Sequence, residues 1–222
     1  MNEDDPGGIQ VLLETERLVL RAFTERDADN LFQLDSDPEV MRYLNGGVPT
    51  PRHLIHQEIL PRFIESSVLA SGVGFWAAIE KASGEFVGWF GLAPGREGDS
   101  SGPALGYRLR RSAWGRGYAT EGSRALIRKA FSDPTVQSVT ATTYQDNLAS
   151  RRVMEKVGMS LARTFRMTTD DLVAERTFDS TGADLWDGDD VEYALDRADW
   201  ERVSDDSQPM SNTAPRVAND SE

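Results

Sequence analysis

A glycine-bearing turn between an expected strand and an expected helix constrains this chain more than any other segment. The strand covers Ala104 to Leu109, and Gly115-Arg116-Gly117-Tyr118-Ala119-Thr120 leads into a helix expected from about Ala119 to Ser132. The first amides of a helix lack acceptors within that helix, and the helix dipole is positive there. Small residues let a diphosphate approach the backbone, so the segment predicts an anion site with Arg116 at its rim, or else a purely structural turn.

Two other kinds of phosphate site do not fit this turn. A Walker loop requires a lysine followed by serine or threonine after its last glycine, and that pair is missing. The dinucleotide fingerprint requires glycine or alanine where Thr120 stands, after a first strand near the start of the domain. Nucleotide hydrolysis and hydride transfer therefore lose their main support.

The rest of the chain alternates between extended and helical patterns. Strands are expected over 17–21, 74–80, 86–92, 104–109, 138–143, 160–167 and 191–195. Helices are expected after a Thr24 and Asp27 cap, from Pro51 to about Ser67, over 119–132, and over 148–157 with a stop at Gly158. The stretches 93–103 and 168–189 are expected to be loops. This order predicts a mixed α/β fold with one central sheet.

Length and composition favour one domain with polar ends. The 222 residues suffice for a single core over 11–203, and tails over 1–10 and 204–222 are polar and expected to be disordered. No apolar run approaches the roughly 20 residues that cross a bilayer, and the acidic start does not resemble an export signal. A cytoplasmic protein without a membrane partner is expected.

The charged and metal-binding residue types exclude further functions. With 37 acidic and 24 basic residues the formal charge is −13, which disfavours a nucleic-acid partner. Cysteine is absent, so disulfides and thiolate nucleophiles are excluded. His53 and His56 lie three apart on an expected helix without an evident third ligand, so no metal site is predicted.

Three segments together resemble one family. Trp-Gly-Arg-Gly-Tyr-Ala-Thr-Glu (114–121) is similar to the acetyl-CoA loop of the GNAT superfamily of N-acetyltransferases, in the branch of the ribosomal-protein-alanine acetyltransferases. Residues 147–159 resemble that branch's N-x-x-S-x-x-x-x-x-K-x-G-F/M segment, and 13–21 resemble its opening. The resemblance spans about 13 to 200 and implies a single GNAT-like domain, α/β (α+β), whose mixed sheet is mostly antiparallel and flanked by helices.

The resemblance also implies how acetyl-CoA is held. The backbone of Tyr107, Arg108 and Leu109 would pair with the pantetheine arm as an added strand. Asn147, which is also a candidate helix N-cap, would hydrogen-bond the pantetheine region, and Ser150 would lie near the thioester sulfur. The pyrophosphate would be held by Gly115, Arg116, Gly117, Tyr118, Ala119 and Thr120.

The catalytic residues are less well defined by sequence. Transfer to an amine requires positioning, a proton acceptor and stabilisation of the departing thiolate. Ser150 is the first candidate for the hydrogen bond to the sulfur and Tyr144 is the second. Ala104 replaces an acidic residue frequent in the family, so the general base is not identified, and Asp170, Asp171 and Glu175 are loop charges or candidates for that role.

The acceptor is expected to be a primary amine, of a protein N-terminus or a small molecule. Trp76, Trp89 and Trp186 are candidate walls of its pocket, and core packing is the alternative for each; acidic residues surround Trp186. The main competing function is a catalytically silent acyl-CoA-binding sensor or interaction module. A metal or nucleotide hydrolase is the third candidate function. Either a monomer or a homodimer is compatible with the sequence.

Overall fold

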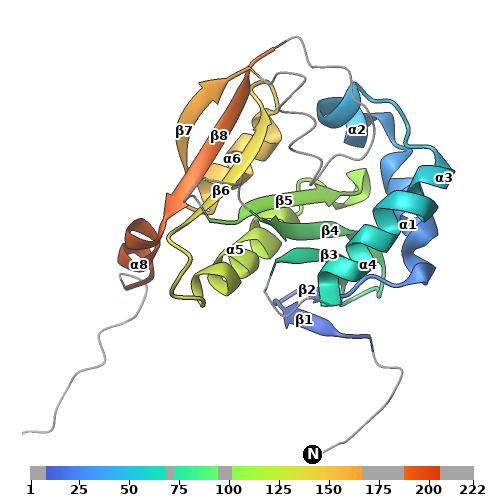
Figure 1. Ribbon diagram of the computed structural model, residues 1–222, viewed down its shortest axis with the longest axis horizontal. Helices are drawn as coiled ribbons and strands as arrows, with labels where there is room; N and C mark the ends of the chain where they lie inside the picture. The colour runs from blue at the N-terminus through green and yellow to red at the C-terminus, as the bar shows by residue number, and fades with distance from the viewer. Residues whose placement is uncertain (1–8, 69–72, 95–101, 167–187, 206–222) are drawn as a thin grey trace, which may run out of the picture.

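One eight-stranded sheet crosses the part of the protein that the computed structural model describes, residues 9–68, 73–94, 102–166 and 188–205 (Figure 1). Its spatial order is β1-β2-β3-β4-β5-β6-β8-β7. Neighbouring strands are antiparallel except for β5 and β6, which are parallel. This confirms the expected mixed, mostly antiparallel sheet. The strands are β1 (Val11–Glu14), β2 (Leu18–Arg21), β3 (Gly74–Glu80), β4 (Phe86–Ala93), β5 (Ala104–Leu109), β6 (Ser138–Tyr144), β7 (Ser160–Phe165) and β8 (Asp190–Asp196).

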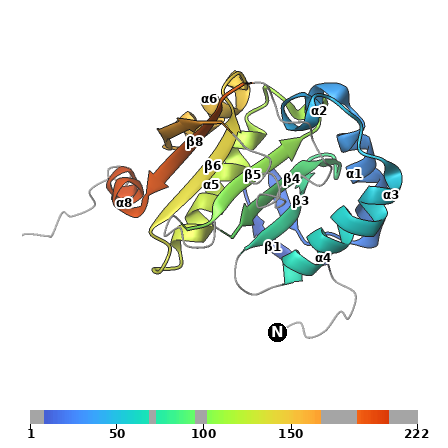
Figure 2. The ribbon, with the colours of Figure 1, turned by 45° about the horizontal axis from the view of Figure 1, so that its top comes forward.

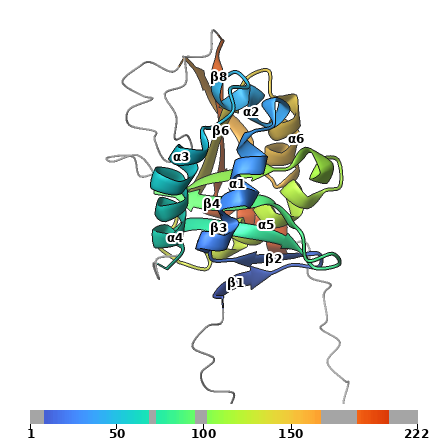
Figure 3. The same cartoon turned by 90° about the vertical axis from the view of Figure 1, so that its right-hand side faces the viewer.

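Helices cover both faces of the sheet, as Figure 3 shows. The first group packs on one face and consists of η1 (Glu25–Asp27), α1 (Ala28–Asp35), α2 (Pro38–Asn45), α3 (Arg52–Leu54), η2 (Ile55–Ile59) and α4 (Leu60–Val68). The other face carries α5 (Tyr118–Phe131) and α6 (Leu148–Lys156). A short η3 (Arg111–Ala113) precedes α5, and α8 (Arg197–Asp205) follows β8 at one end of the sheet (Figure 2).

Successive side chains of the central strands point to opposite faces of the sheet, so two hydrophobic cores form. Phe75 and Trp89 join the core under α1 and α4, whereas Trp76 and Phe90 join the core under α5 and α6. The second turn of α5 can lie close to β4 because it contains Gly122: a Cβ there would come within 2.3 Å of the Phe90 ring. The sheet is thus covered on both faces, and its central strands are almost wholly buried.

A buried ion pair fastens α1 to β5. Arg108 donates from Nη1 to Oδ1 of Asp35 at 2.8 Å, and the two side chains are only 6% and 1% exposed. Its guanidinium also lies 5.3 Å from the Trp89 ring. Breaking a buried pair by removing one partner typically costs about 3–5 kcal/mol, because the remaining charge stays desolvated. The position of α1 on the sheet is therefore tied to β5.

Local sequence signals account for several helix ends. The expected cap is present: the Asp27 carboxylate accepts from the Thr24 amide at 2.9 Å, and α1 follows. The helix expected from Pro51 to Ser67 is continuous but contains the wider π turn η2. Pro61 follows that turn; because proline has no N–H and crowds the preceding turn, a regular α-helix is interrupted there.

Three elements were not expected from sequence: β1, α2 and α8. The signals for α2 were nevertheless present, since Asp37 caps the Glu39 amide at 3.0 Å, Pro38 starts the helix and Gly46 ends it with φ +75°. The expected tails and the loops over 93–103 and 168–189 fall mostly outside the described residues. Among the described residues, no helix is long and apolar enough to cross a bilayer.

Candidate functional site

The parallel strands β5 and β6 meet and then separate, and they point in different directions in Figure 1. They share the pair Ala104 and Thr140, and the Thr140 amide donates to Pro103 at 3.1 Å. Farther along, β5 stays paired with β4 up to Leu109, and β6 stays paired with β8 up to Tyr144. Half of the peptide groups of β5 face the gap, where an extended ligand can pair with them as an added strand.

The turn after β5 presents backbone amides at the mouth of this gap. Gly115 and Gly117 adopt φ of +71° and +85°, which glycine reaches without steric cost, and α5 starts at Tyr118. The indole of Trp114 donates to the Leu109 carbonyl at 2.8 Å and closes the turn. A Cβ on Gly115 would meet no described atom within 4 Å, so this side of the turn is open. Open amides at a helix start form an anion site.

The turn is held from one side by the β3–β4 hairpin. Arg116 pairs with Glu80 at 2.6 Å, Tyr118 donates a hydrogen bond to the same carboxylate, and Ser83 donates to its second oxygen at 2.7 Å. The hydrogen bonds from Tyr118 and Ser83 lower the pKa of Glu80, and the bond to Glu80 raises the pKa of Tyr118. Arg116 was expected at the rim of the anion site; it is half exposed and anchors the turn to the hairpin.

The β1–β2 turn, which contacts that hairpin through Lys81, also holds the glycine turn. The Arg17 guanidinium pairs with Glu121 in α5 at 2.6 Å and donates to the Arg116 carbonyl at 2.9 Å. Thr15 donates to the same carboxylate at 2.6 Å, and so does the Arg17 amide at 2.8 Å. Burial alone would raise the pKa of Glu121, but the hydrogen bonds from Thr15 and Arg17 outweigh it and the pKa is lowered. Neither segment alone carries a signal for these contacts, which join positions about 100 residues apart in the chain.

A second group of polar contacts lies where α6 faces β5. Asn147 caps α6 by accepting from the Ser150 amide at 3.2 Å, and its own amide donates to Thr143 at 3.0 Å. The Tyr107 hydroxyl is 2.9 Å from the Ser150 hydroxyl and 3.2 Å from the Ser150 carbonyl. Burial raises the pKa of Tyr107 to about 12, so its hydroxyl stays protonated near neutral pH.

The structure separates the other candidate residues. Tyr144 lies at the end of β6, and its hydroxyl donates to the Leu44 carbonyl of α2 at 3.4 Å. It therefore lies on the side of the gap that faces α2. Trp76 and Trp89 are each 2% exposed and belong to the two cores, which is the alternative that the sequence left open for them. Trp186, with Asp170, Asp171, Glu175, Asp179, Asp184 and Asp187, lies outside the described residues.

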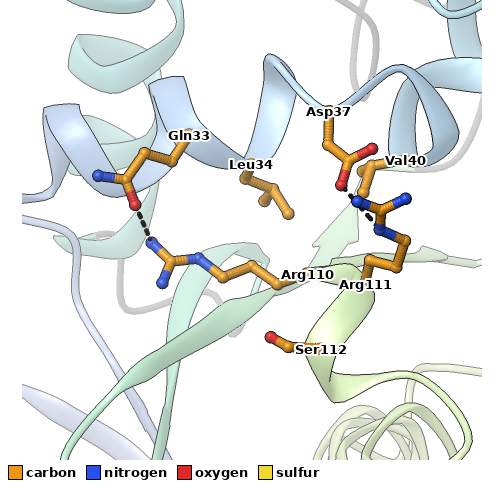
Figure 4. Close-up of a pocket in the computed structure, with 7 residues that line it drawn as sticks. All are labelled: Gln33, Leu34, Asp37, Val40, Arg110, Arg111 and Ser112. Carbon is orange, nitrogen blue, oxygen red and sulfur yellow. Dashed lines mark hydrogen bonds and ion pairs between the residues drawn. The ribbon is translucent and has the colours of Figure 1, made fainter.

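A pocket of about 310 Å³ adjoins the start of the turn on the α1–α2 side (Figure 4). In it Arg111 pairs with Asp37 at 3.3 Å. Arg110 donates to the amide oxygens of Gln33 at 3.2 Å and Asn30 at 2.9 Å, and desolvation lowers the pKa of Arg110. The remaining lining residues are Leu34, Val40 and Ser112.

The described residues contain no group of three side chains able to hold a metal ion. His53 lies on α3 and His56 on η2, apart from the glycine turn.

Known proteins share both the sequence and the fold. Residues 17–160 match the family described as acetyltransferase (GNAT) domain. An Aspergillus fumigatus protein named FsC-acetyl coenzyme A-N(2)-transacetylase is 30% identical over 215 residues, covering 94% of this chain and 86% of that protein. A GNAT-family acetyltransferase structure from Bacillus anthracis has a TM-score of 0.65 at 22% identity, covering 83% of this chain and 97% of that one. The aminoglycoside acetyltransferase AAC(6')-Ib, solved with coenzyme A, has a TM-score of 0.62 at 19% identity, covering 84% and 99%.

The Glu80 contacts predict a specific pH dependence. Since the folded-state pKa of Glu80 is lowered, its contribution to stability is present above its unfolded pKa of about 4.3 and is lost as the pH falls through the folded value. The free energy of unfolding, measured by urea titration, should therefore drop less between pH 5.5 and pH 3 in Glu80→Gln than in the unmodified protein. Glu39→Gln, exposed on α2, is the matched control. Equal pH dependence of Glu80→Gln and the unmodified protein would contradict the prediction.

Proposed function

The chain belongs to the acetyltransferase (GNAT) domain family, and we propose that it transfers the acetyl group of acetyl-CoA to a primary amine by direct attack on the thioester. The observation that carries the proposal is the continuity of the gap between β5 and β6 with the open amides at the start of α5. An extended arm ending in a diphosphate fits these two features together, because the arm requires a strand edge and the diphosphate requires free amides.

The residues present suit acetyl-CoA as the co-substrate, which supplies the acetyl group already activated as a thioester. The backbone of Tyr107 to Leu109 would pair with the pantetheine arm along the gap. The amides from Gly115 to Thr120 would hold the pyrophosphate, on the side of the turn where a Cβ at Gly115 meets open space. Asn147 would reach the pantetheine region from the start of α6, where it already caps the helix.

The acceptor must attack as a neutral amine. A lysine amine with a pKa near 10.4 is neutral in only about one part in a thousand at pH 7.4, whereas an α-amine near 7.8 is about one quarter neutral. A protein N-terminus therefore needs less help from a base than a lysine does. The site must still orient the amine and receive its proton, through a side chain or a water chain.

Ser150 is the residue we assign to the departing sulfur, with Tyr144 as the second candidate. The Ser150 hydroxyl lies on the helix that borders the gap, and Tyr107 holds it at 2.9 Å. Tyr107 keeps its one hydroxyl hydrogen near neutral pH and can donate it to the carbonyl or to the hydroxyl of Ser150. When it donates to the hydroxyl, the serine hydrogen can be directed to another acceptor. A hydrogen bond to a thiolate is charge-assisted and stronger than one to a neutral thioester, so it favours departure.

Two classes of acceptor follow from different observations. Residues 147–159 resemble the ribosomal-protein-alanine acetyltransferase branch and favour a protein N-terminus. The Aspergillus fumigatus relative is named for an N(2) position and for FsC, and not for a protein N-terminus, so a small-molecule amine stays the second candidate. We place the N-terminal amine first, because the neutral fraction of an α-amine suits a site in which no base is identified.

A melting experiment and an amine panel test the proposal. Acetyl-CoA should raise the melting temperature, and thiol release from acetyl-CoA should depend on an amine in a panel of small amines and peptides with different N-terminal residues. Binding without release on any amine would instead favour a catalytically silent acyl-CoA sensor. The absence of a thermal shift would refute the cofactor site.

The backbone of the turn predicts the effect of a substitution at Gly117. Its φ of +85° strains any β-branched residue, and a Cβ there would meet Arg17 Nη2 at 3.3 Å. Gly117→Val should therefore abolish the acetyl-CoA melting shift. Gly46→Val is the matched control, because Gly46 has φ +75° and ends α2 away from the turn. A normal melting shift in Gly117→Val would contradict the assignment of the turn.

If Ser150 stabilises the departing sulfur, its replacement should affect turnover much more than cofactor binding. Ser150→Ala should lower kcat about 10- to 100-fold, the effect of losing one hydrogen bond to a charged group, with little change in the Kd for CoA. The measurements are thiol release and calorimetry, and Ser132→Ala at the exposed end of α5 is the control. A normal kcat in Ser150→Ala would remove this residue from the chemistry.

A further inference from the structure

Arg17 lies directly behind the glycine turn. Its guanidinium makes two kinds of contact at once: Nε and Nη2 meet one oxygen of Glu121 at 2.7 and 2.6 Å, and Nη1 reaches the Arg116 carbonyl at 2.9 Å. The nearest atom to a Cβ built on Gly117 is also its Nη2. The planar fork of arginine thus joins the first turn of α5 to the peptide that links Arg116 and Gly117.

The contact with the Arg116 carbonyl determines where the next amide points. In a trans peptide the C=O and the following N–H lie in one plane and point in opposite directions. Because Arg17 holds the Arg116 carbonyl toward the β1–β2 turn, the Gly117 N–H is directed away from that turn. Rotation of this peptide would remove the amide from the open side of the glycine turn.

We propose that Arg17 is a positioning residue of the cofactor site, which orients the Arg116–Gly117 peptide so that the Gly117 amide meets the pyrophosphate of acetyl-CoA. This inference rests on the proposed function. Arg17 acts through the backbone and needs no contact with the ligand.

Glu121 neutralises the charge of Arg17 behind the glycine turn. A carboxylate in the first turn of α5 stabilises the helix dipole but repels a phosphate at the same helix end. Its pairing with Arg17, at 17% exposure of the glutamate side chain, makes the pair neutral as a unit. Thr15 and the Arg17 amide fix the other carboxylate oxygen. The β1–β2 turn therefore contributes orientation rather than net positive charge.

Ligands with and without the pyrophosphate distinguish positioning from general stability. Arg17→Met should weaken CoA binding about tenfold, which corresponds to about 1.4 kcal/mol, and should leave the binding of pantetheine, which has no pyrophosphate, unchanged. The measurements are calorimetry for CoA and ligand-observed NMR for pantetheine. Hydrogen exchange at Gly117 should become faster in Arg17→Met without CoA, because the peptide is no longer held.

Lys81→Met is the matched control, because Lys81 donates to Thr15 in the same turn at 2.7 Å and pairs with Glu14 but does not touch the glycine turn. It should bind both ligands normally. Arg17→Lys keeps the positive charge beside Glu121 but cannot contact Glu121 and the Arg116 carbonyl at the same time. It should therefore also weaken CoA binding, and it serves if Arg17→Met does not fold.

Three outcomes overturn the inference in distinguishable ways. Unchanged CoA affinity in both Arg17→Met and Arg17→Lys would refute the role of Arg17 alone. Equal losses for CoA and pantetheine would show a general structural effect. A lack of CoA binding by the unmodified protein would refute the cofactor site, and the positioning role with it.

Discussion

The separation of β5 from β6 is the constraint on which the rest of the site depends. A parallel pair inside a sheet normally continues its ladder, because unpaired peptide groups are costly when buried. Here the pair at Ala104 and Thr140 is followed by divergence, while each strand keeps its antiparallel partner. The start of α6 lies beside the opening, with Asn147 and Ser150 as its first polar residues. A strand edge is thereby kept inside the protein, available to a ligand that brings its own donors and acceptors.

The two sides of this opening are held in place by contacts between segments that are distant in the sequence. The Arg108–Asp35 pair ties α1 to β5, and the Tyr107 hydroxyl ties β5 to α6. At the mouth, Glu80 and Arg17 hold the glycine turn from two hairpins. Each of these contacts includes a residue of β5 or of the turn that follows it. The geometry of the proposed cofactor site is therefore supported by elements on both faces of the sheet.

The sequence was sufficient for those features that local chemistry determines. The Thr24 and Asp27 cap, the strand–turn–helix segment and the Asn147 cap follow from signals within a few residues, and the structure contains all three. The helix α2 carried equally local signals, which were overlooked. In contrast, the Arg17–Glu121 contact joins positions 104 residues apart, and nothing in either segment identifies the other as its partner. Trp76 and Trp89 were ambiguous because their burial depends on which helices cover each face of the sheet.

The charges around the turn show how an acidic protein can hold a polyanion. Arg17, Arg116 and Arg111 lie at or near the turn, and each is paired with a carboxylate, of Glu121, Glu80 and Asp37 respectively. These side chains contribute little net positive charge, and the chain as a whole carries a formal charge of −13. In the proposed site, the attraction for the pyrophosphate would then come from oriented peptide groups and the dipole of α5, which act over short distances. Binding would depend on the orientation of a few amides, and the arginines would fix the backbone instead of contacting the ligand.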